Sequence, residues 1–501
     1  MENYQYKTTP FEHQVVALDR SAYAPYYGLL MEQRTGKSKV ICDTAAILHR
    51  DGKINALVIV APNGVHRNWV SDEIKIHLPD WVDRTVVAWT GATTQQAEKQ
   101  RETLYNPGHH LRIFAVNFEA LVSTRGYEFT KRFLQSTTAM LVVDESTRIK
   151  NPDATVTKKL MKLRDLALYR RILNGTPVTQ SPLDVFSQLL FLHDDAVPTQ
   201  SWACFRTRYA TYLSPDSPLI RGIMQKGAAK YPPKIIATNA AGQPMYKNLE
   251  DLKSWVDRCC YRVTRAEIGF MPAKLYKRWE VEIPSQQQQR IKGYLRAMKE
   301  GHTPEPITKM VGVMLYQRML CGIIPKQLTG TGEDEKMYPT PADNPRLKAL
   351  LEIMAAYPDS SMVIWARFRS DLTEISNLIE EVTGKKVGRY WGDIPAAERD
   401  QAKDDFQAKR VQYFIGQQAA GGVGLPLHAA DVVVYHSNTF SLYHRLQSED
   451  RAENLAKKTS TLIIDLEAPG SVDVKIVDAL RAKRDVADLI TGDTTGDWLC
   501  W

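Results

Sequence analysis

Residues 139–145 read Ala-Met-Leu-Val-Val-Asp-Glu, an apolar run that ends in two neighbouring carboxylates. A run of this length, closed by acidic side chains, predicts a buried strand with polar groups at its end. Segments of helical period such as 37–50 separate it from further apolar runs. These other runs cover residues 56–62, 112–117, 361–367, 411–417, 431–437 and 461–467. Strands that alternate with helices predict an α/β fold in which the sheets are mostly parallel.

The apolar runs form two groups, and the chain between the groups has mostly helical patterning with turn-rich interruptions. Residues 248–266, 285–301 and 307–320 are expected to be helical. We therefore expect two α/β lobes with helical insertions between them. The expected parts are a first lobe at 1–190, its helical insertion at 191–275, a helical insertion of the second lobe at 276–340, the second lobe at 341–480 and a C-terminal tail at 481–501.

The composition is that of an ordinary globular protein. The 501 residues include 65 Lys and Arg against 57 Asp and Glu, a formal charge of +8, with 44% hydrophobic and 24% charged residues. These values exclude wholesale disorder and collagen-like or coiled-coil architecture. No apolar stretch approaches the roughly 18 residues that span a bilayer, and the N-terminus lacks a signal pattern, so we expect no membrane partner. The six cysteines lack zinc-site spacing and indicate a reducing compartment, while the positive charge permits an acidic partner without requiring one.

Residues 31–38, Met-Glu-Gln-Arg-Thr-Gly-Lys-Ser, follow an apolar run and open a helix-period segment. In a P-loop, backbone N–H groups and the helix N-terminus hold phosphates, the lysine reaches the β- and γ-phosphates, and the serine hydroxyl binds Mg²⁺. This pattern makes Thr35, Gly36, Lys37 and Ser38 candidate ATP-binding residues. The usual pattern begins with glycine where this chain has Met31, so the motif alone is equally consistent with an ordinary helix start.

Asp144 and Glu145 strengthen the nucleotide interpretation. They stand where a buried strand leaves the carboxyl edge of the sheet, which is the ligand-binding edge of open α/β sheets. Asp144 is expected to hold Mg²⁺ together with Ser38, partly through water, and Glu145 to orient and deprotonate the attacking water. By themselves the two residues could form an acidic turn. A P-loop and an acidic strand end in one lobe together predict an ATP and Mg²⁺ site with Lys37 as a further catalytic residue.

Several segments in this order resemble motifs of the SWI/SNF-type ATPases of helicase superfamily two. The resemblance begins with Asp144-Glu-Ser-Thr-Arg-Ile-Lys-Asn151, followed by Leu173-Asn-Gly-Thr-Pro177 and an apolar helix. The other matching segments are residues 11–14, 58–73, 261–274, 388–392, 417–437 and 447–457. The match covers most of the chain, and the compact size is similar to bacterial or bacteriophage members of the family.

The resemblance implies two RecA-like lobes with ATP in the cleft between them. Gln14 would recognise adenine, and Gly424 and Arg451 would approach the nucleotide from the second lobe, Arg451 as a catalytic residue. The residues implied to couple the nucleotide to nucleic acid, or to contact nucleic acid, are Asn63, Arg67, Asn174, Gly175, Thr176, Arg367 and Gln417.

The last motif departs from the family pattern, because Asn454 stands where a second arginine is expected. An arginine that stabilises charge on the transferring phosphate can be worth about 10³–10⁵ in rate. Three alternatives follow: Arg451 suffices alone, Lys457 or Lys458 substitutes imperfectly for the second arginine, or hydrolysis is slow. We expect ATPase activity to survive. Thr147 replaces the histidine usual in the second motif, which affects local coupling rather than metal chemistry.

The resemblance implies an ATP-dependent translocase on DNA, with duplex, sequence-independent binding through the phosphate backbone. A strand-separating DNA or RNA helicase is the first alternative, because the core motifs are shared. An ATP-gated DNA-binding regulator with weak or no hydrolysis is the second, because of Asn454. The expected location is the cytoplasm, or the host cytoplasm for a bacteriophage protein; protein partners and oligomeric state are not specified by the sequence.

Overall fold

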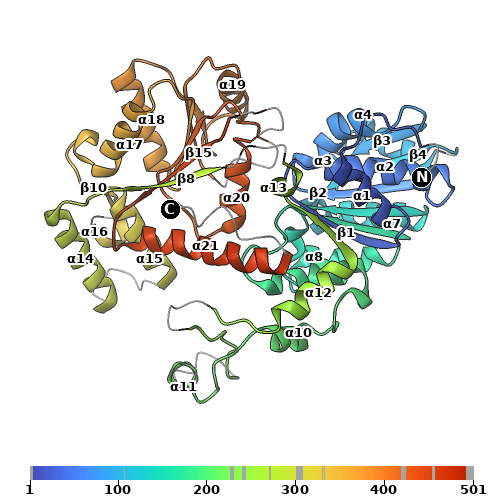
Figure 1. The fold of residues 1–501 in the computed structure, drawn as a ribbon, viewed down its shortest axis with the longest axis horizontal. Helices are drawn as coiled ribbons and strands as arrows, with labels where there is room; N and C mark the ends of the chain where they lie inside the picture. Colours follow the sequence, from blue (N-terminus) through green and yellow to red (C-terminus); the bar gives the residue numbers. More distant parts are fainter. Residues whose placement is uncertain are drawn as a thin grey trace. The chain divides into compact units, whose positions relative to one another are not determined.

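The computed structural model describes residues 4–106, 108–225, 231–239, 244–269, 272, 274–300, 309–329, 331, 333–418, 425–453, 457 and 459–491 (Figure 1). The chain divides into two compact units. Unit 1 comprises Met1–Gly269 and Ala482–Thr494, and unit 2 comprises Phe270–Arg481 and Thr495–Trp501. Each unit contains one large parallel sheet.

Unit 1 is built on a seven-stranded sheet in the order β3-β4-β2-β5-β6-β1-β7, in which every pair of neighbours is parallel. Its strands are β1 Tyr26–Met31, β2 Ala56–Ala61, β3 Arg84–Ala88, β4 Leu111–Asn117, β5 Ala139–Asp144, β6 Tyr169–Leu173 and β7 Cys260–Val263. Its helices are α1 Glu12–Ser21, α2 Lys37–Arg50, α3 Val65–Asn68, α4 Ile74–His77, α5 Gln95–Glu102, α6 Phe118–Val122, α7 Thr124–Gln135, α8 Thr155–Arg164, α9 Val185–Leu192, α10 Trp202–Tyr209, α11 Pro218–Gln225, α12 Leu249–Cys259 and α13 Arg265–Ile268.

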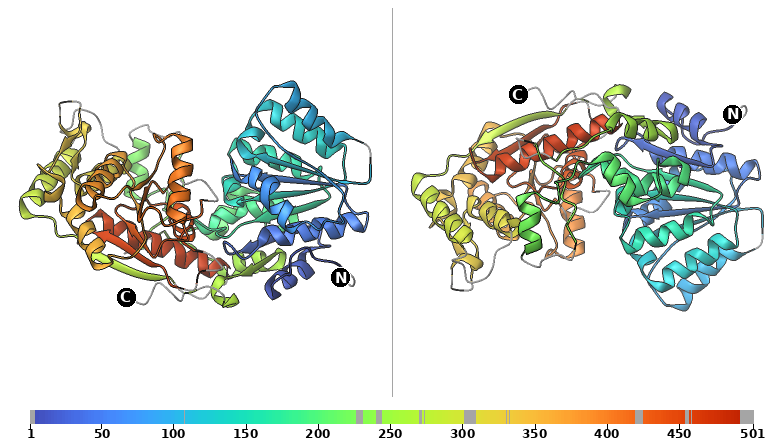
Figure 2. Two further views of the ribbon diagram at one scale, coloured as in Figure 1. Left: turned by 90° about the horizontal axis from the view of Figure 1, so that it is seen from above. Right: turned by 90° about the horizontal axis from the view of Figure 1, so that it is seen from below.

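The central strands of unit 1 are apolar throughout because both faces of the sheet are covered. Alternate residues point to opposite faces. Ile59 and Val142 belong to the core that packs under α1 and α2, while their neighbours Val60 and Val143 belong to the core under α7, α8 and α9. Figure 2 shows helices on both faces of the sheet. This two-sided burial explains why these strands read as continuous apolar runs.

Unit 2 repeats the plan with a six-stranded parallel sheet in the order β12-β13-β11-β14-β15-β8. Its strands are β8 Leu275–Glu280, β11 Met362–Trp365, β12 Gly388–Tyr390, β13 Tyr413–Gly416, β14 Val432–Tyr435 and β15 Leu462–Glu467, with the small antiparallel pair β9 Ile323–Ile324 and β10 Glu335–Lys336. Its helices are α14 Ser285–Glu300, α15 Lys309–Leu320, α16 Lys326–Thr329, α17 Pro345–Ala356, α18 Arg369–Thr383, α19 Ala396–Gln407, α20 Leu442–Asp450 and α21 Val472–Thr491, the last of which continues into unit 1.

The predicted fold class is confirmed, since both sheets are parallel and carry helices on their faces. Three local expectations are wrong. Residues 260–263 were expected to be helical but form the edge strand β7, and residues 275–280, placed largely in a helical insertion, form the edge strand β8. The expected tail at 481 begins inside α21. No helix among the described residues is both long and apolar enough to cross a bilayer.

Candidate functional site

The predicted site residues of unit 1 follow strands that end at one edge of its sheet. Because the strands are parallel, the chain leaves β1 at Met31, β2 at Ala61 and β5 at Asp144 on the same side. The carboxyl edge of an open parallel sheet is where such proteins bind ligands. The fold therefore gathers the P-loop segment and the acidic pair on a single edge.

The P-loop segment turns into α2 through Gly36, whose φ is +87°. The backbone conformation favours glycine, and a Cβ at this position would lie 2.1 Å from Nε2 of Gln14, so a larger residue would displace the Gln14 amide. Lys37 follows as the first residue of the helix, and its Nζ donates to the carbonyl oxygens of Met31 at 2.8 Å and Glu32 at 3.0 Å. The ammonium group is thereby held within the turn that precedes the helix.

Gln14 supports the same loop from α1. Its Nε2 donates to the Thr35 carbonyl at 3.0 Å, and its Oε1 accepts from the Phe11 N–H at 3.0 Å. The His13 ring also lies on this carbonyl, with Nε2 at 2.8 Å from the Thr35 oxygen. The structure thus brings Gln14 to the P-loop, and its recognition of adenine stays a prediction.

Asp144 lies at the end of β5 among groups suited to a cation site. Burial raises the pKa of the Asp144 carboxyl, while the hydrogen bond from Trp69 and the positive charge of Lys37 oppose that rise. Burial likewise raises the pKa of Glu73; a hydrogen bond with Ser38 opposes this effect, and the charge of Asp144 adds to it. Ser38 and Asp144, the predicted Mg²⁺ ligands, therefore share their surroundings with a further carboxylate. Carboxylate and hydroxyl oxygens are the donors that Mg²⁺ prefers.

Glu145 has a strained backbone, with φ of +53° and ψ of +55° in the left-handed region. Such a conformation costs a non-glycine residue roughly 1–3 kcal/mol, and it clusters at functional sites. The side chain is buried, and Gln33 of the P-loop donates to its Oε1 at 3.0 Å. The contact links the P-loop directly to the residue predicted to handle the attacking water.

Asn174 joins the segment after β6 to the segment after β5. Its Nδ2 donates to the hydroxyls of Ser146 and Thr147 and to Oε1 of Gln188, each at 3.2 Å, and its Oδ1 accepts from the Thr176 N–H at 2.9 Å. Gly175 packs against the P-loop, because a Cβ there would lie 3.0 Å from the backbone nitrogen and Cγ of Gln33. Of the three predicted coupling residues, Asn174 therefore contacts the segment after β5, Gly175 contacts the P-loop, and Thr176 contacts Asn174.

Asn63 and Arg67 line a cavity of about 520 Å³ at the same edge of unit 1. The lining residues are Asn63, His66, Arg67, Trp89, Thr90, Gly91, Asn117, Ala120, Ser123 and Arg125. Asn63 and Arg67 are exposed, and the Arg125 guanidinium lies over the Trp89 ring at 5.6 Å from its centroid. Two arginines and several N–H and hydroxyl groups make this a cavity suited to an anionic ligand.

Arg367 and Gln417, the residues of unit 2 that are predicted to contact nucleic acid, lie together at the carboxyl ends of β11 and β13. Nε2 of Gln417 donates to the Arg367 carbonyl at 2.9 Å, and Nη1 of Arg367 donates to Oε1 of Gln317 at 2.9 Å. Burial lowers the pKa of the Arg367 guanidinium.

Arg451 is buried in unit 2, directly after α20. Lys457 donates to the carbonyls of Ala430 and Ala452 and to the Thr461 hydroxyl, so it is held by its own unit. This anchoring disfavours Lys457 as a substitute for the missing arginine. Gly424, Asn454 and Lys458 lie outside the described residues, so their predicted parts in the site are not tested.

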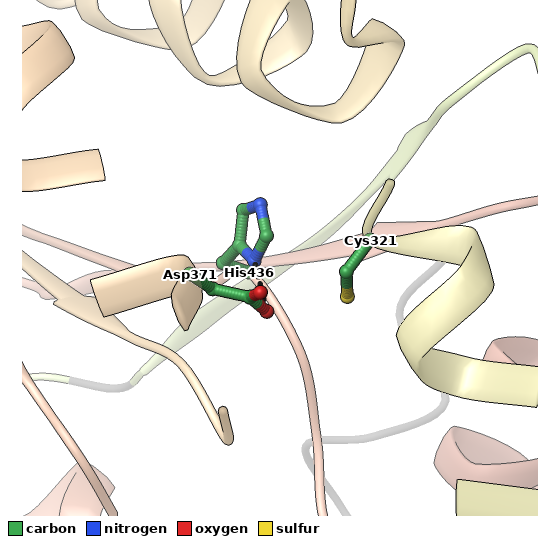
Figure 3. Close-up of side chains that lie close together, drawn as sticks. All are labelled: Cys321, Asp371 and His436. Atoms are coloured by element: carbon green, nitrogen blue, oxygen red, sulfur yellow. Dashed lines mark ion pairs between the residues drawn. The ribbon is translucent and has the colours of Figure 1, made fainter. Parts of the chain in front are cut away.

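A separate cluster in unit 2 contains Cys321, Asp371 and His436, which are buried (Figure 3). One ligand atom from each lies within 4.8 Å of the others, and Nδ1 of His436 is 3.8 Å from Oδ2 of Asp371. Burial raises the pKa of Asp371 to about 7, against the opposing effects of Cys321 and Arg346. Burial also lowers the pKa of His436 well below its usual value. Nη1 of Arg346 lies 3.8 Å from the Cys321 sulfur, and this fixed positive charge opposes a metal cation there.

Sequence reasoning missed four contributors to the unit 1 site: Gln33, Trp69, Glu73 and Gln188. Trp69 donates to Asp144 across 75 positions of sequence, and Gln33 donates to Glu145 across 112. Gln33 lies in the P-loop segment 31–38, and Trp69 and Glu73 lie in the motif at 58–73, but neither motif indicates contacts with the segment after β5.

Comparison with known proteins agrees with this architecture. The SNF2-related domain model matches residues 20–313, and the helicase conserved C-terminal domain model matches residues 345–454. The chain is 23% identical to a chromodomain-helicase-DNA-binding protein 1-like of Danio rerio, covering 92% of this chain and 42% of the relative. It is 22% identical to the DNA repair and recombination protein RDH54 of Saccharomyces cerevisiae, covering 93% of this chain and 49% of that relative. The chain thus spans about half the length of these relatives.

Among solved structures, the SWI2/SNF2 ATPase core of Sulfolobus solfataricus in complex with dsDNA is similar at 18% identity and a TM-score of 0.41. That alignment covers 99% of this chain and 95% of the other.

Proposed function

The chain belongs to the SNF2-related domain family, and from this premise we propose that it is an ATPase that moves along duplex DNA without separating the strands. In this proposal ATP binds at the carboxyl edge of the unit 1 sheet. The DNA is held through its phosphate backbone, independently of sequence.

One observation carries the ATPase part of the proposal: Lys37, Ser38 and Asp144 meet at one sheet edge. Lys37 and Ser38 begin the helix that follows β1, Asp144 ends β5, and the two parallel strands leave the sheet at the same edge. A helix N-terminus, a lysine and a cation-binding carboxylate are the parts that hold a nucleoside triphosphate. Their convergence is what the family resemblance implies for phosphoryl transfer.

The residues present fit Mg-ATP. Ser38 and Asp144 would hold the metal ion, which when bound neutralises charge on the phosphates. Lys37 would bind the phosphates through its ammonium group, in exchange for the carbonyls of Met31 and Glu32. Glu145 would accept a proton from the attacking water, with its carboxylate oriented by Gln33. Arg451 is proposed to act on the transferring phosphate.

The DNA part of the proposal is supported by the cavity lined by Asn63, Arg67 and Arg125. Arginine and backbone N–H groups bind phosphate oxygens without reading base edges. Such binding is strongly salt-dependent. Arg367 and Gln417, held together in unit 2, are proposed as a second backbone contact.

The test is steady-state ATP hydrolysis with duplex DNA, single-stranded DNA and RNA, combined with displacement of a third strand from a DNA triplex. We expect duplex DNA to stimulate hydrolysis most and the third strand to be displaced. Lys37→Ala and Glu145→Gln should abolish turnover, whereas Lys53→Ala, an exposed lysine of the same unit, should not.

Other outcomes identify the alternatives. Separation of the strands of a partial duplex would support a helicase, with RNA stimulation indicating an RNA substrate. Nucleotide-dependent DNA binding without turnover would support an ATP-gated regulator. Hydrolysis that no nucleic acid stimulates would refute the motor.

A further inference from the structure

A single helical segment after β2 reaches the phosphate site from outside the P-loop. It consists of α3, a π-helical turn over Trp69–Glu73 and α4, and the Ile74 N–H closes the turn on the Trp69 carbonyl five residues back. π-turns are rare and occur frequently at functional sites. In this turn Trp69 reaches Asp144, which is predicted to bind the metal ion.

Trp69 fixes Asp144. It is among the largest fully buried side chains of the protein, and its Nε1 donates to Oδ2 of Asp144 at 2.9 Å. The Glu145 N–H donates to the other oxygen, Oδ1, also at 2.9 Å. Two donors on two different oxygens determine the orientation of the carboxylate plane. The remaining lone pairs of Asp144 are therefore presented in one direction before any ligand binds.

We propose that Trp69 is a positioning residue for a divalent cation, because it orients the carboxylate of Asp144. The inference rests on the proposed function, because it assigns this residue to the metal side of the same nucleotide site. Groups that orient metal ligands typically change metal affinity by about 10–100-fold when removed. A merely structural tryptophan would change the stability of unit 1 and leave the metal dependence unaltered.

The experiment measures binding of a fluorescent ADP analogue to the full chain, once in Mg²⁺ and once in EDTA, and Mn²⁺ binding by electron paramagnetic resonance in the presence of ADP. Trp69→Phe keeps an aromatic ring and removes the N–H donor. We expect it to weaken Mn²⁺ binding by about 10-fold. Its ADP affinity in EDTA should match the wild type, since that state does not use the cation.

Trp365→Phe is the matched control for lost packing. Trp365 is also fully buried, but its indole nitrogen has no hydrogen-bond partner among the described residues. We expect this variant to bind Mn²⁺ as the wild type does.

Equal Mn²⁺ affinity in Trp69→Phe and Trp365→Phe would overturn the role of Trp69. Failure of the proposed function is distinguishable, because the wild-type protein itself would then bind ADP without any dependence on the cation.

Discussion

Replacing Gly36 with alanine tests how the P-loop is built. The added Cβ would lie 2.1 Å from Nε2 of Gln14, in a residue whose φ is +87°. Alanine at positive φ costs roughly 1–2 kcal/mol. The Gln14 amide can move away, but only by giving up its hydrogen bonds to the Thr35 carbonyl and the Phe11 N–H. At about 1 kcal/mol for each bond, we expect Gly36→Ala to destabilise unit 1 by about 3 kcal/mol.

Gln14→Ala removes the same two hydrogen bonds and should cost about 2 kcal/mol. In the double variant the clash is absent, so Gly36→Ala should then add only its backbone cost of about 1 kcal/mol. The double-mutant cycle therefore predicts a coupling of about 2 kcal/mol between the two positions, with the double variant less damaged than the sum of the singles.

Urea denaturation followed by circular dichroism supplies the four free energies of unfolding, and ADP binding reports on the site. Gly52→Ala is the control for backbone strain alone, because Gly52 has φ of +65° and a Cβ there would meet nothing within 4 Å. The reasoning is refuted if the two substitutions are additive, or if Gly36→Ala costs no more than Gly52→Ala.

Three further outcomes follow from the structure. Burial raises the folded-state pKa of Asp371 from 3.8 to about 7, so the stability that its protonation contributes is present at low pH and is lost as pH rises through 7. Asp371→Asn is neutral at every pH. In denaturant titrations, its free energy of unfolding should therefore gain up to about 4 kcal/mol relative to the wild type between pH 4 and pH 8. Arg445 is buried against Asp465 and Glu449, so Arg445→Met should destabilise unit 2 by about 3–5 kcal/mol in thermal unfolding, and an unchanged midpoint would contradict that. Asn174→Ala breaks the link between the segments after β5 and β6, and should reduce DNA stimulation of hydrolysis more than basal hydrolysis; equal losses would argue against coupling through this side chain.

The central strands could be predicted from the sequence because burial on both faces leaves an uninterrupted apolar signal. Ala56–Ala61 and Met362–Trp365 are buried at every position. The edge strands lack that signal: Leu275–Glu280 contains no buried residue, and Cys260–Val263 is buried only at its two ends. An edge strand pairs with only one neighbouring strand, and its side chains are partly exposed to solvent. Its sequence therefore mixes apolar and polar residues, as that of an amphipathic helix does.

The same distinction separates the predictable site residues from the others. Lys37, Ser38 and Asp144 belong to short motifs in which neighbouring residues supply the chemistry, so a local pattern identifies them. Trp69, Gln33 and the other supporting residues act through contacts between distant segments. A tryptophan within an amphipathic segment is normally a core residue, and Trp69 is one; its bond to Asp144 depends on how the sheet aligns β2 with β5.

The helical segment from α3 to α4 connects the two proposed ligand sites of unit 1. Its first turn places His66 and Arg67 in the wall of the cavity, and its π-turn places Trp69 against Asp144. Because successive residues of a helix advance by about 100°, a change to α-helical winding would rotate one end of the segment relative to the other. The π-turn therefore fixes how the cavity-lining residues are rotated relative to Trp69, and with it the present alignment of the two sites.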